Sequence, residues 1–206
     1  MSGTLGRRPA TRQTGTERFH AAGVDLGFDL LGFWQWSTSD LLSNVTRGRL
    51  AEYLVARALG LNIDGVRDDW APFDLCTPSG LRIEVKSAAF IQSWHQTRLS
   101  SIQFGVPPTR AWNADTSVLS EIAQRQADVY VFALLCHANK STVDPLNVDH
   151  WAFFVLPTGI LNARTRSQQS ITLRTLERLC PGRIAYEDLP GAVERAAVIA
   201  SGAPTR

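Results

Sequence analysis

Two short runs of alternating residues, joined by a turn, constrain the fold of this chain more than any other feature. The runs are residues 73–76 and 81–87, and the four residues between them read Thr-Pro-Ser-Gly. Pro and Gly in this order are typical of a β-turn, and successive side chains along a strand point to opposite faces. The pattern therefore predicts an antiparallel hairpin with one apolar face and one charged face.

The charged residues of this predicted hairpin are Asp74, Glu84 and Lys86. A turn centred near Ser79 places Asp74 opposite or diagonal to Glu84, and the period of two puts Glu84 and Lys86 on one face. Facing carboxylates repel each other unless a cation lies between them, and their oxygens suit Mg²⁺, or Mn²⁺ in its place. The spacing predicts a metal site. The alternative is a solvated hairpin face on which Glu84 and Lys86 form an ordinary surface pair.

A fourth residue, Glu52, lies upstream in a stretch with helical periodicity. Apolar residues recur at helical spacing across residues 46–60, and the final glycine is a typical stop signal. Glu52 falls within the apolar arc, so its carboxylate is expected to point partly into the protein and to need a partner. Two interpretations stay open: Glu52 joins the hairpin carboxylates, or it pairs with Arg49 or Arg57 on its own helix.

Glu on a first helix, Asp on one strand and Glu-x-Lys on the next is an order that resembles the PD-(D/E)XK nuclease superfamily. The resemblance covers residues 52–86, although Phe73 stands where that family often has the proline before its Asp. It implies a restriction-endonuclease-like fold and hydrolysis of phosphodiester bonds. The catalytic residues that it implies are Glu52, Asp74, Glu84 and Lys86, with a metal site formed by Glu52, Asp74, Glu84 and the Val85 backbone carbonyl.

The rest of the chain can be divided into elements that agree with this core. The expected class is α/β, a mixed β-sheet flanked by helices, with a restriction-endonuclease-like αβββαβ core and C-terminal helical additions. Apolar runs predict buried strands, and helical spacing with start signals predicts helices. The expected strands are residues 63–66, 129–136 and 150–156, and the expected helices are residues 117–126, 171–180 and 191–200.

Composition limits the class of protein. With 206 residues, of which 44% are hydrophobic, the chain can bury a full core without disulfides. Its three cysteines, Cys76, Cys136 and Cys180, lack zinc-site spacing and are expected to be buried thiols in a reducing compartment. No run is long and apolar enough for a membrane span, and no signal peptide is visible, so a cytoplasmic protein is expected.

The domain organisation follows from a composition shift near the start. Residues 1–18 carry four arginines against one acid among Gly, Ser, Thr and Pro, which predicts a flexible basic arm. The arm either binds phosphates or only solubilises the chain. Residues 19–206 are expected to form a single nuclease-like domain.

Nucleic-acid contacts are expected in the segment after the second hairpin strand. Guanidinium and amide groups suit phosphates and aromatic rings stack on bases, while the plainer alternative is a packed surface loop. The candidate residues are Gln92, Trp94, Gln96 and Arg98. A second polar and basic run, either phosphate-binding or plain surface, contains Arg164, Arg166, Gln168, Gln169 and Arg174.

The function that the sequence predicts is a Mg²⁺-dependent nuclease, most readily a DNA endonuclease. Phosphate-binding glycine loops and serine-hydrolase elbows are absent from the sequence, which leaves phosphodiester chemistry as the specific hypothesis. The alternatives are a nuclease-derived module that binds nucleic acid or protein without cutting, and an α/β scaffold with structural carboxylates. A homodimer or a partner protein that supplies recognition is compatible with the sequence.

Overall fold

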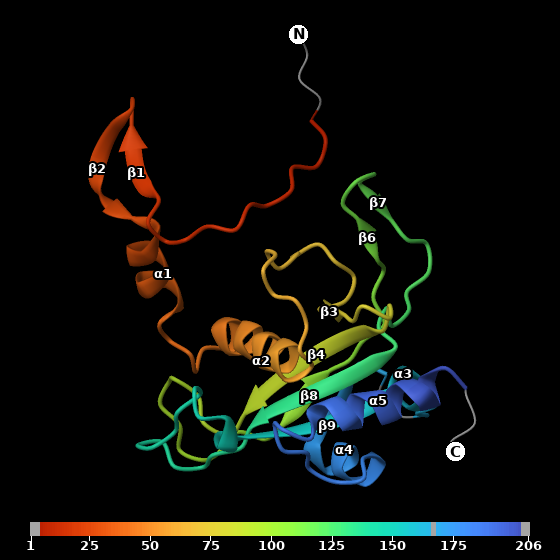
Figure 1. The fold of residues 1–206 in the computed structure, drawn as a ribbon. Coiled ribbons are helices and arrows are strands. Elements are labelled where there is room, and N and C mark those ends of the chain that lie inside the picture. Colours follow the sequence, from red (N-terminus) through yellow and green to blue (C-terminus); the bar gives the residue numbers. More distant parts are fainter. Residues whose placement is uncertain (1–4, 166–167, 203–206) are drawn as a thin grey trace.

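The centre of the molecule is a four-stranded mixed β-sheet in a computed structural model that describes residues 5–165 and 168–202. The strand order is β3-β4-β8-β9 (Figure 1). The β4 and β8 strands run parallel, whereas β3 on β4 and β9 on β8 are antiparallel. The strands are β3 (Leu75–Cys76), β4 (Arg82–Ala89), β8 (Val129–Leu135) and β9 (Trp151–Pro157). The predicted mixed α/β class is confirmed.

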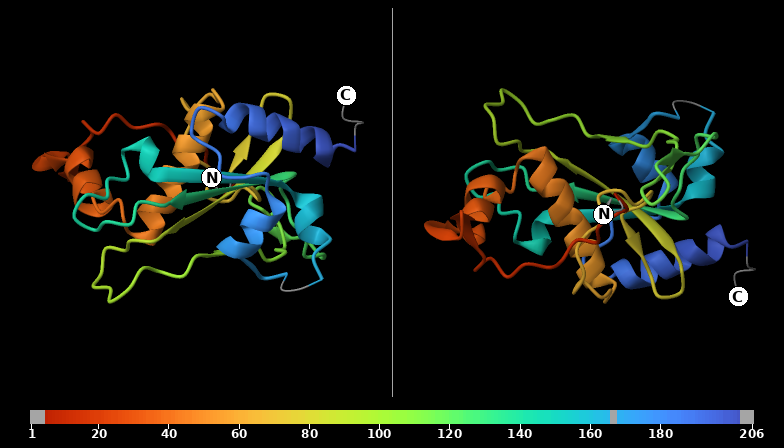
Figure 2. Two further views of the ribbon diagram at one scale, coloured as in Figure 1. Left: turned by 90° about the horizontal axis from the view of Figure 1, so that it is seen from below. Right: turned by 90° about the horizontal axis from the view of Figure 1, so that it is seen from above.

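Helices cover both faces of this sheet, as Figure 2 shows from two sides. One face packs against α2 (Asn44–Ala58) and α5 (Leu189–Ala200). The opposite face packs against α3 (Thr158–Asn162) and α4 (Leu173–Leu179). All seven residues of β8 and all seven of β9 are buried. Helices cover both faces of these strands, so their side chains contribute to the core on each face.

The strongest sequence signals gave the correct elements. The hairpin is present, with Leu75 opposite Ile83. Ser43 is the N-cap of α2, and its hydroxyl accepts a hydrogen bond from the Thr46 N–H. Gly60, shortly after the end of the helix, has a φ of 63°. The predicted strands at residues 129–136 and 150–156 and the predicted helix at residues 191–200 are confirmed as β8, β9 and α5.

Two predicted elements are wrong. Residues 63–66 form no strand, because the Asn62 side chain accepts from the Asp64 N–H and closes a local turn. Residues 117–126 form no helix: they contain β7 (Val118–Leu119), which pairs with β6 (Trp112–Asn113). The Asn113 side chain accepts from two backbone N–H groups of the intervening turn, and this turn chemistry outweighs the helical spacing that follows.

A third prediction holds only in part. The expected helix at residues 171–180 is present as α4, but its first two residues belong to β10 (Ser170–Thr172), which pairs with β5 (Gln103–Gly105). Thr172 ends the strand and caps the helix by accepting from the Thr175 N–H at 3.3 Å. The short helix η1 (Val148–His150) precedes β9 and was not expected.

The chain before α2 extends away from the sheet (Figure 1). Residues 5–17 contain no helix or strand, and then β1 (Arg18–Ala21), β2 (Val24–Asp29) and α1 (Leu30–Thr38) follow. This N-terminal hairpin and helix contain no buried residue. The proposed division into residues 1–18 and 19–206 stays a prediction.

The cysteines differ from expectation in one respect. Cys180 is buried, Cys136 is half-buried and Cys76 is exposed at the end of β3, so the prediction of three buried thiols is wrong for Cys76. Of the helices that the described residues form, none has the length and apolar character needed to cross a membrane. The cytoplasmic location stays a prediction.

Replacing a core ring with alanine should destabilise the fold strongly. Phe153 is fully buried on β9 and packs beside Trp151 and Tyr186. Phe153→Ala is expected to lower the free energy of unfolding by about 3–5 kcal/mol, measured by urea denaturation. Phe28→Ala is the matched control, since Phe28 is 53% exposed on β2, and it should cost less than about 1 kcal/mol. Equal losses would contradict the assignment of the core.

Candidate active site at the edge of β4

Asp74 is fixed against the edge of β4 by two hydrogen bonds. Its backbone N–H donates to the Ile83 carbonyl at 3.1 Å, and its Oδ2 accepts from the Val85 N–H at 2.7 Å. Because β3 pairs only with the first two residues of β4, this stretch of β4 is otherwise a sheet edge. The N–H and C=O of one strand residue point to the same side, so the Val85 carbonyl also lies on this edge.

Glu84 and Lys86 lie on the same face of β4, as the sequence predicted. The Lys86 Nζ is 2.5 Å from Glu84 Oε1, and both side chains are partly buried. Ile83, before Glu84, and Val85, between Glu84 and Lys86, point to the other face of the sheet and are buried in its core. The alternation of a strand therefore separates the charged groups from the apolar core next to α2.

Glu52 reaches the same region from α2. Its side chain is 13% exposed, close to the 16% of Asp74 and the 17% of Glu84. The expectation that its carboxylate points partly into the protein is confirmed. Its ion-pair partner is Arg67, so the alternative in which it pairs with Arg49 or Arg57 on its own helix is wrong.

Arg67 links the carboxylates of this cluster. Its Nη2 donates to Glu52 Oε1 at 3.0 Å and lies 3.4 Å from Asp74 Oδ1, while its Nε donates to the second Glu52 oxygen. A further short hydrogen bond joins its Nη1 to Asp69. One guanidinium therefore contacts two of the carboxylates that the sequence assigned to a metal site, and it belongs to the segment between α2 and β3.

Burial dominates the electrostatics of the site. It is the largest cause that raises the pKa of Asp74, and the neighbouring Glu84 charge raises it further. Burial likewise raises the pKa of Glu52, although the hydrogen bond from Arg67 opposes the change. Tyr130 pairs with Glu84 across the sheet, and burial, together with the Glu84 charge, raises its pKa to about 12. Negative charge is thus concentrated where solvent is partly excluded.

The donor atoms suit a hard cation in kind. Carboxylate oxygens and an edge carbonyl are typical ligands of Mg²⁺, and the repulsion between Asp74 and Glu84 would be relieved by positive charge between them. Across residues 5–165 and 168–202, however, no three His, Cys, Asp or Glu side chains stand ready-grouped around a metal position. In this structure the Glu52 and Asp74 carboxylates are instead paired with Arg67.

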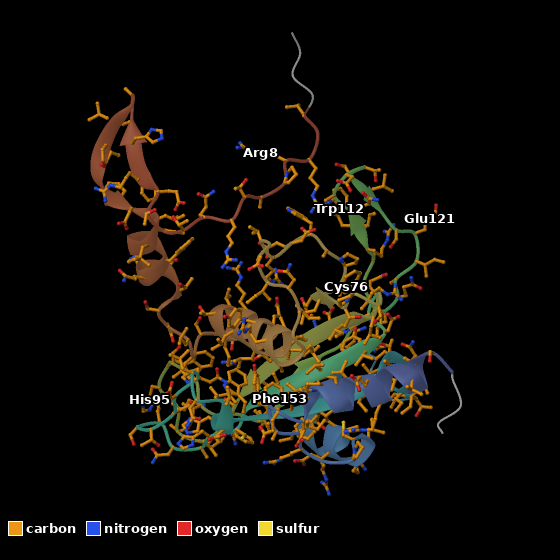
Figure 3. The ribbon with its side chains drawn as sticks, in the orientation of Figure 1. Arg8, Cys76, His95, Trp112, Glu121 and Phe153 are labelled. Carbon is orange, nitrogen blue, oxygen red and sulfur yellow. The ribbon has the colours of Figure 1, made fainter. Side chains whose placement is uncertain are left out.

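The predicted nucleic-acid residues lie beyond the carboxyl end of β4. Figure 3 labels His95 in this segment, far from Cys76 beside the start of β4. Trp94 and Arg98 are exposed. Gln92 is buried and donates to the Ala89 carbonyl, and Gln96 bonds to the Gln92 N–H and the Phe90 carbonyl. Both glutamines therefore hold the segment together, and contact with nucleic acid stays a prediction for all four residues.

The second polar run is mostly engaged in internal contacts. Arg164 donates to the Ser170 carbonyl, and Gln168 donates to the Arg164 carbonyl. The Gln169 carbonyl accepts from the Val106 N–H, and Arg174 lies in α4. Arg166 lies outside the described residues. The Gln169 bond joins the run to the residue that follows β5, whereas the other two bonds lie within residues 164–170.

Sequence reasoning missed Arg67 and Asp69 as members of the charged cluster. Both lie in a stretch that forms neither helix nor strand, so no periodicity indicated where their side chains point. The only available signal was the run Arg67-Asp68-Asp69 shortly before Asp74, which places a cation near the predicted carboxylates.

The fold and the cluster together define a candidate enzyme. Carboxylates with raised pKa values and a lysine, gathered at one edge of a mixed sheet, are the kind of polar group by which active sites are recognised. The family model described as bacteriophage T4 endonuclease IV matches residues 34–175, more than half of the chain. This protein belongs to that family, and the membership indicates an endonuclease. No curated protein matched the chain.

The raised pKa of Asp74 predicts a pH-dependent effect on stability. A carboxyl whose pKa rises on folding contributes stability that is present below its unfolded pKa and lost as the pH rises through its folded pKa. Asp74→Asn removes that loss and keeps an oxygen for the Val85 N–H. The variant should therefore be more stable than the wild type at pH 8, with the difference vanishing below about pH 4.

The control is Asp128→Asn, because the hydrogen bond from Arg82 lowers the pKa of Asp128. Its contribution to stability is present above the unfolded pKa and lost as the pH falls, so this variant should be less stable than the wild type at pH 8. Urea denaturation at pH 8 and below about pH 4 measures the difference in unfolding free energy between each variant and the wild type. A loss of stability at pH 8 in Asp74→Asn would contradict the electrostatic account of the site.

Proposed function

We propose that this protein is a Mg²⁺-dependent DNA endonuclease that hydrolyses phosphodiester bonds at the edge of β4. The observation that supports this most is the convergence of Glu52 from α2, Asp74 from the residue before β3, and Glu84 and Lys86 from β4. All four lie within the stretch that matches the endonuclease family. They are also the residues that the PD-(D/E)XK resemblance would assign to catalysis.

The carboxylates of Glu52, Asp74 and Glu84, with the Val85 carbonyl, would hold Mg²⁺ or Mn²⁺. When bound, such an ion polarises a phosphate and makes water easier to deprotonate. The chain's own contribution is to keep these oxygens preorganised. Asp74 is held by the Val85 N–H, and burial keeps competing water away from the Asp74 and Glu52 carboxylates.

Lys86 is the residue proposed to act on the reacting groups. Its ammonium lies 2.5 Å from Glu84 and its side chain is 31% exposed, so it can reach a phosphate that enters from the open edge. There it would orient the attacking water and neutralise charge that builds on the phosphate oxygens. Interactions that strengthen in the transition state raise turnover more than they raise affinity.

Nucleic acid is the proposed partner, with the exposed side chains of Trp94 and Arg98 as contacts. Gln92 and Gln96 would serve by ordering the segment that carries them. A dimer or a recognition protein is compatible with the exposed N-terminal hairpin and helix, where Phe28 and Trp36 are exposed. We propose a cytoplasmic location, in keeping with a reducing compartment for the free cysteines.

Cleavage assays test the proposed activity. Purified protein is incubated with circular and linear DNA in Mg²⁺ or Mn²⁺, beside Glu84→Gln and Lys86→Ala. Both variants are expected to lose about 100-fold or more in cleavage rate, because Glu84→Gln removes the charge of a proposed metal ligand and Lys86→Ala removes the ammonium proposed to act at the phosphate. Lys86→Ala should keep DNA affinity within about threefold, since its role is in the transition state.

The matched control is Glu194→Gln, an exposed glutamate on α5 away from this cluster, which should cleave at the wild-type rate. Cleavage that persists in Glu84→Gln would sink the proposed site. Binding without cleavage by the wild-type protein in either metal would favour a module derived from a nuclease.

Arg98→Ala tests the proposed contact segment. Arg98 is exposed, so its loss should weaken DNA binding without unfolding the chain. One lost phosphate contact should reduce the slope of log affinity against log salt concentration by about 1. Arg178→Ala, which removes an exposed arginine from α4, is the control and should leave the slope unchanged. Equal slopes in all three proteins would exclude Arg98 from the interface.

A further inference from the structure

Arg67 occupies the position at which the Glu52 and Asp74 carboxylates face each other. Its guanidinium donates to both Glu52 oxygens and lies 3.4 Å from one Asp74 oxygen, Oδ1. The other Asp74 oxygen is taken by the Val85 N–H. The guanidinium thus uses the carboxylate oxygens that a cation between α2 and β4 would need.

The segment that carries Arg67 is irregular, and its ties to the N-terminal residues lie on the surface. Residues 61–74 contain no helix or strand. Two ion pairs tie this segment to the N-terminal residues, Arg7 with Asp68 at 2.5 Å and Arg12 with Asp64 at 3.2 Å. All four side chains are exposed, by 37–86%, and exposed pairs contribute only about 0–1 kcal/mol each. These two pairs therefore oppose a movement of the Arg67 side chain only weakly, and its main contacts are the Glu52 and Asp74 carboxylates themselves.

There is also space into which the Arg67 side chain can move. A pocket of about 810 Å³ adjoins it, between the N-terminal residues, the Arg67 segment and β6. Asp69, which already accepts from Arg67 Nη1, lines this pocket together with Asp68 and Asp115. The Arg67 side chain is 38% exposed, so rotation towards the pocket moves its charge from one set of carboxylates to another without burying it.

We propose that Arg67 is an internal counter-ion of the active site, and that a divalent cation binds Glu52 and Asp74 only by displacing it. The inference rests on the proposed metal site and adds a control on its occupancy. Because Arg67 already donates to both Glu52 oxygens and lies beside Asp74 Oδ1, a metal ion on the same oxygens would be in close contact with a like charge. The apparent affinity for the metal is then the intrinsic affinity reduced by the fraction of molecules in which Arg67 has moved away.

The two states also differ in how the carboxylates are balanced. With Arg67 in place, Glu52 and Asp74 share one positive charge, and Asp74 also repels Glu84. A divalent ion brings two charges and lies nearer to the carboxylate oxygens than a guanidinium carbon can. Displacement therefore becomes favourable at a metal concentration set by the Arg67 contacts, and removing those contacts must tighten metal binding.

The test is a Mn²⁺ titration of the full chain by calorimetry and by electron paramagnetic resonance of the free ion, without nucleic acid. Arg67→Gln should bind Mn²⁺ about tenfold more tightly than the wild type. Arg57→Gln is the control, because it removes an exposed arginine from α2, the helix that carries Glu52, and it should leave the affinity for Mn²⁺ unchanged. Circular dichroism of each variant establishes that it is folded.

Asp74→Asn separates the two hypotheses. If Mn²⁺ binds the wild type and Asp74→Asn abolishes the binding, the metal site stands, and an equal or weaker affinity in Arg67→Gln overturns the counter-ion role alone. If neither the wild type nor Arg67→Gln binds Mn²⁺, the metal site and the counter-ion role fall together. Binding that is detectable only in Arg67→Gln would support the proposal strongly.

Discussion

The hydrogen bond from the Val85 N–H to the Asp74 carboxylate is the interaction on which the site depends. An edge strand leaves backbone groups without a ladder partner, and such groups must be satisfied elsewhere. Asp74 satisfies one of them and is thereby fixed in position and orientation. The same bond leaves Oδ1 facing α2, where Glu52 and Arg67 meet it. One side chain, Asp74, therefore both satisfies an unpaired N–H of the sheet edge and sets the geometry of the acidic cluster.

The cluster is held together by balanced charge in a place where charge is costly. Glu52, Asp74 and Glu84 are each more than four-fifths buried, and burial raises the pKa values of the first two. Lys86 and Arg67 supply two positive charges to these three carboxylates. A buried set of like charges is tolerated only with such partners, and its cost is typical of sites kept for chemistry. This imbalance is the reason that a further cation suits the site.

The sequence predicted what local periodicity and turn chemistry determine. The hairpin, α2, β8 and β9 followed from alternation, helical spacing and apolar runs, and the hairpin alone brought Asp74 and Glu84 together. Arg67 could not be placed, because irregular backbone gives side chains no predictable direction. The helix expected at residues 117–126 failed for a similar reason. There, Asn113 closes a turn and Thr109 exchanges backbone hydrogen bonds with Gln124, a non-local pairing that spacing cannot reveal.

The family match includes the candidate site but not the N-terminal residues that pair with the Arg67 segment. Residues 34–175 include α2, the Arg67 segment, the hairpin and the strands that position them. The stretch before residue 34 lies outside the match, yet Arg7 and Arg12 from it pair with Asp68 and Asp64 on either side of Arg67. The catalytic candidates therefore belong to the part of the chain that defines the family, whereas the segment that carries Arg67 is also tied to residues outside it. If Arg67 controls access of a cation to Glu52 and Asp74, the N-terminal residues that pair with its segment can influence whether Arg67 leaves these carboxylates.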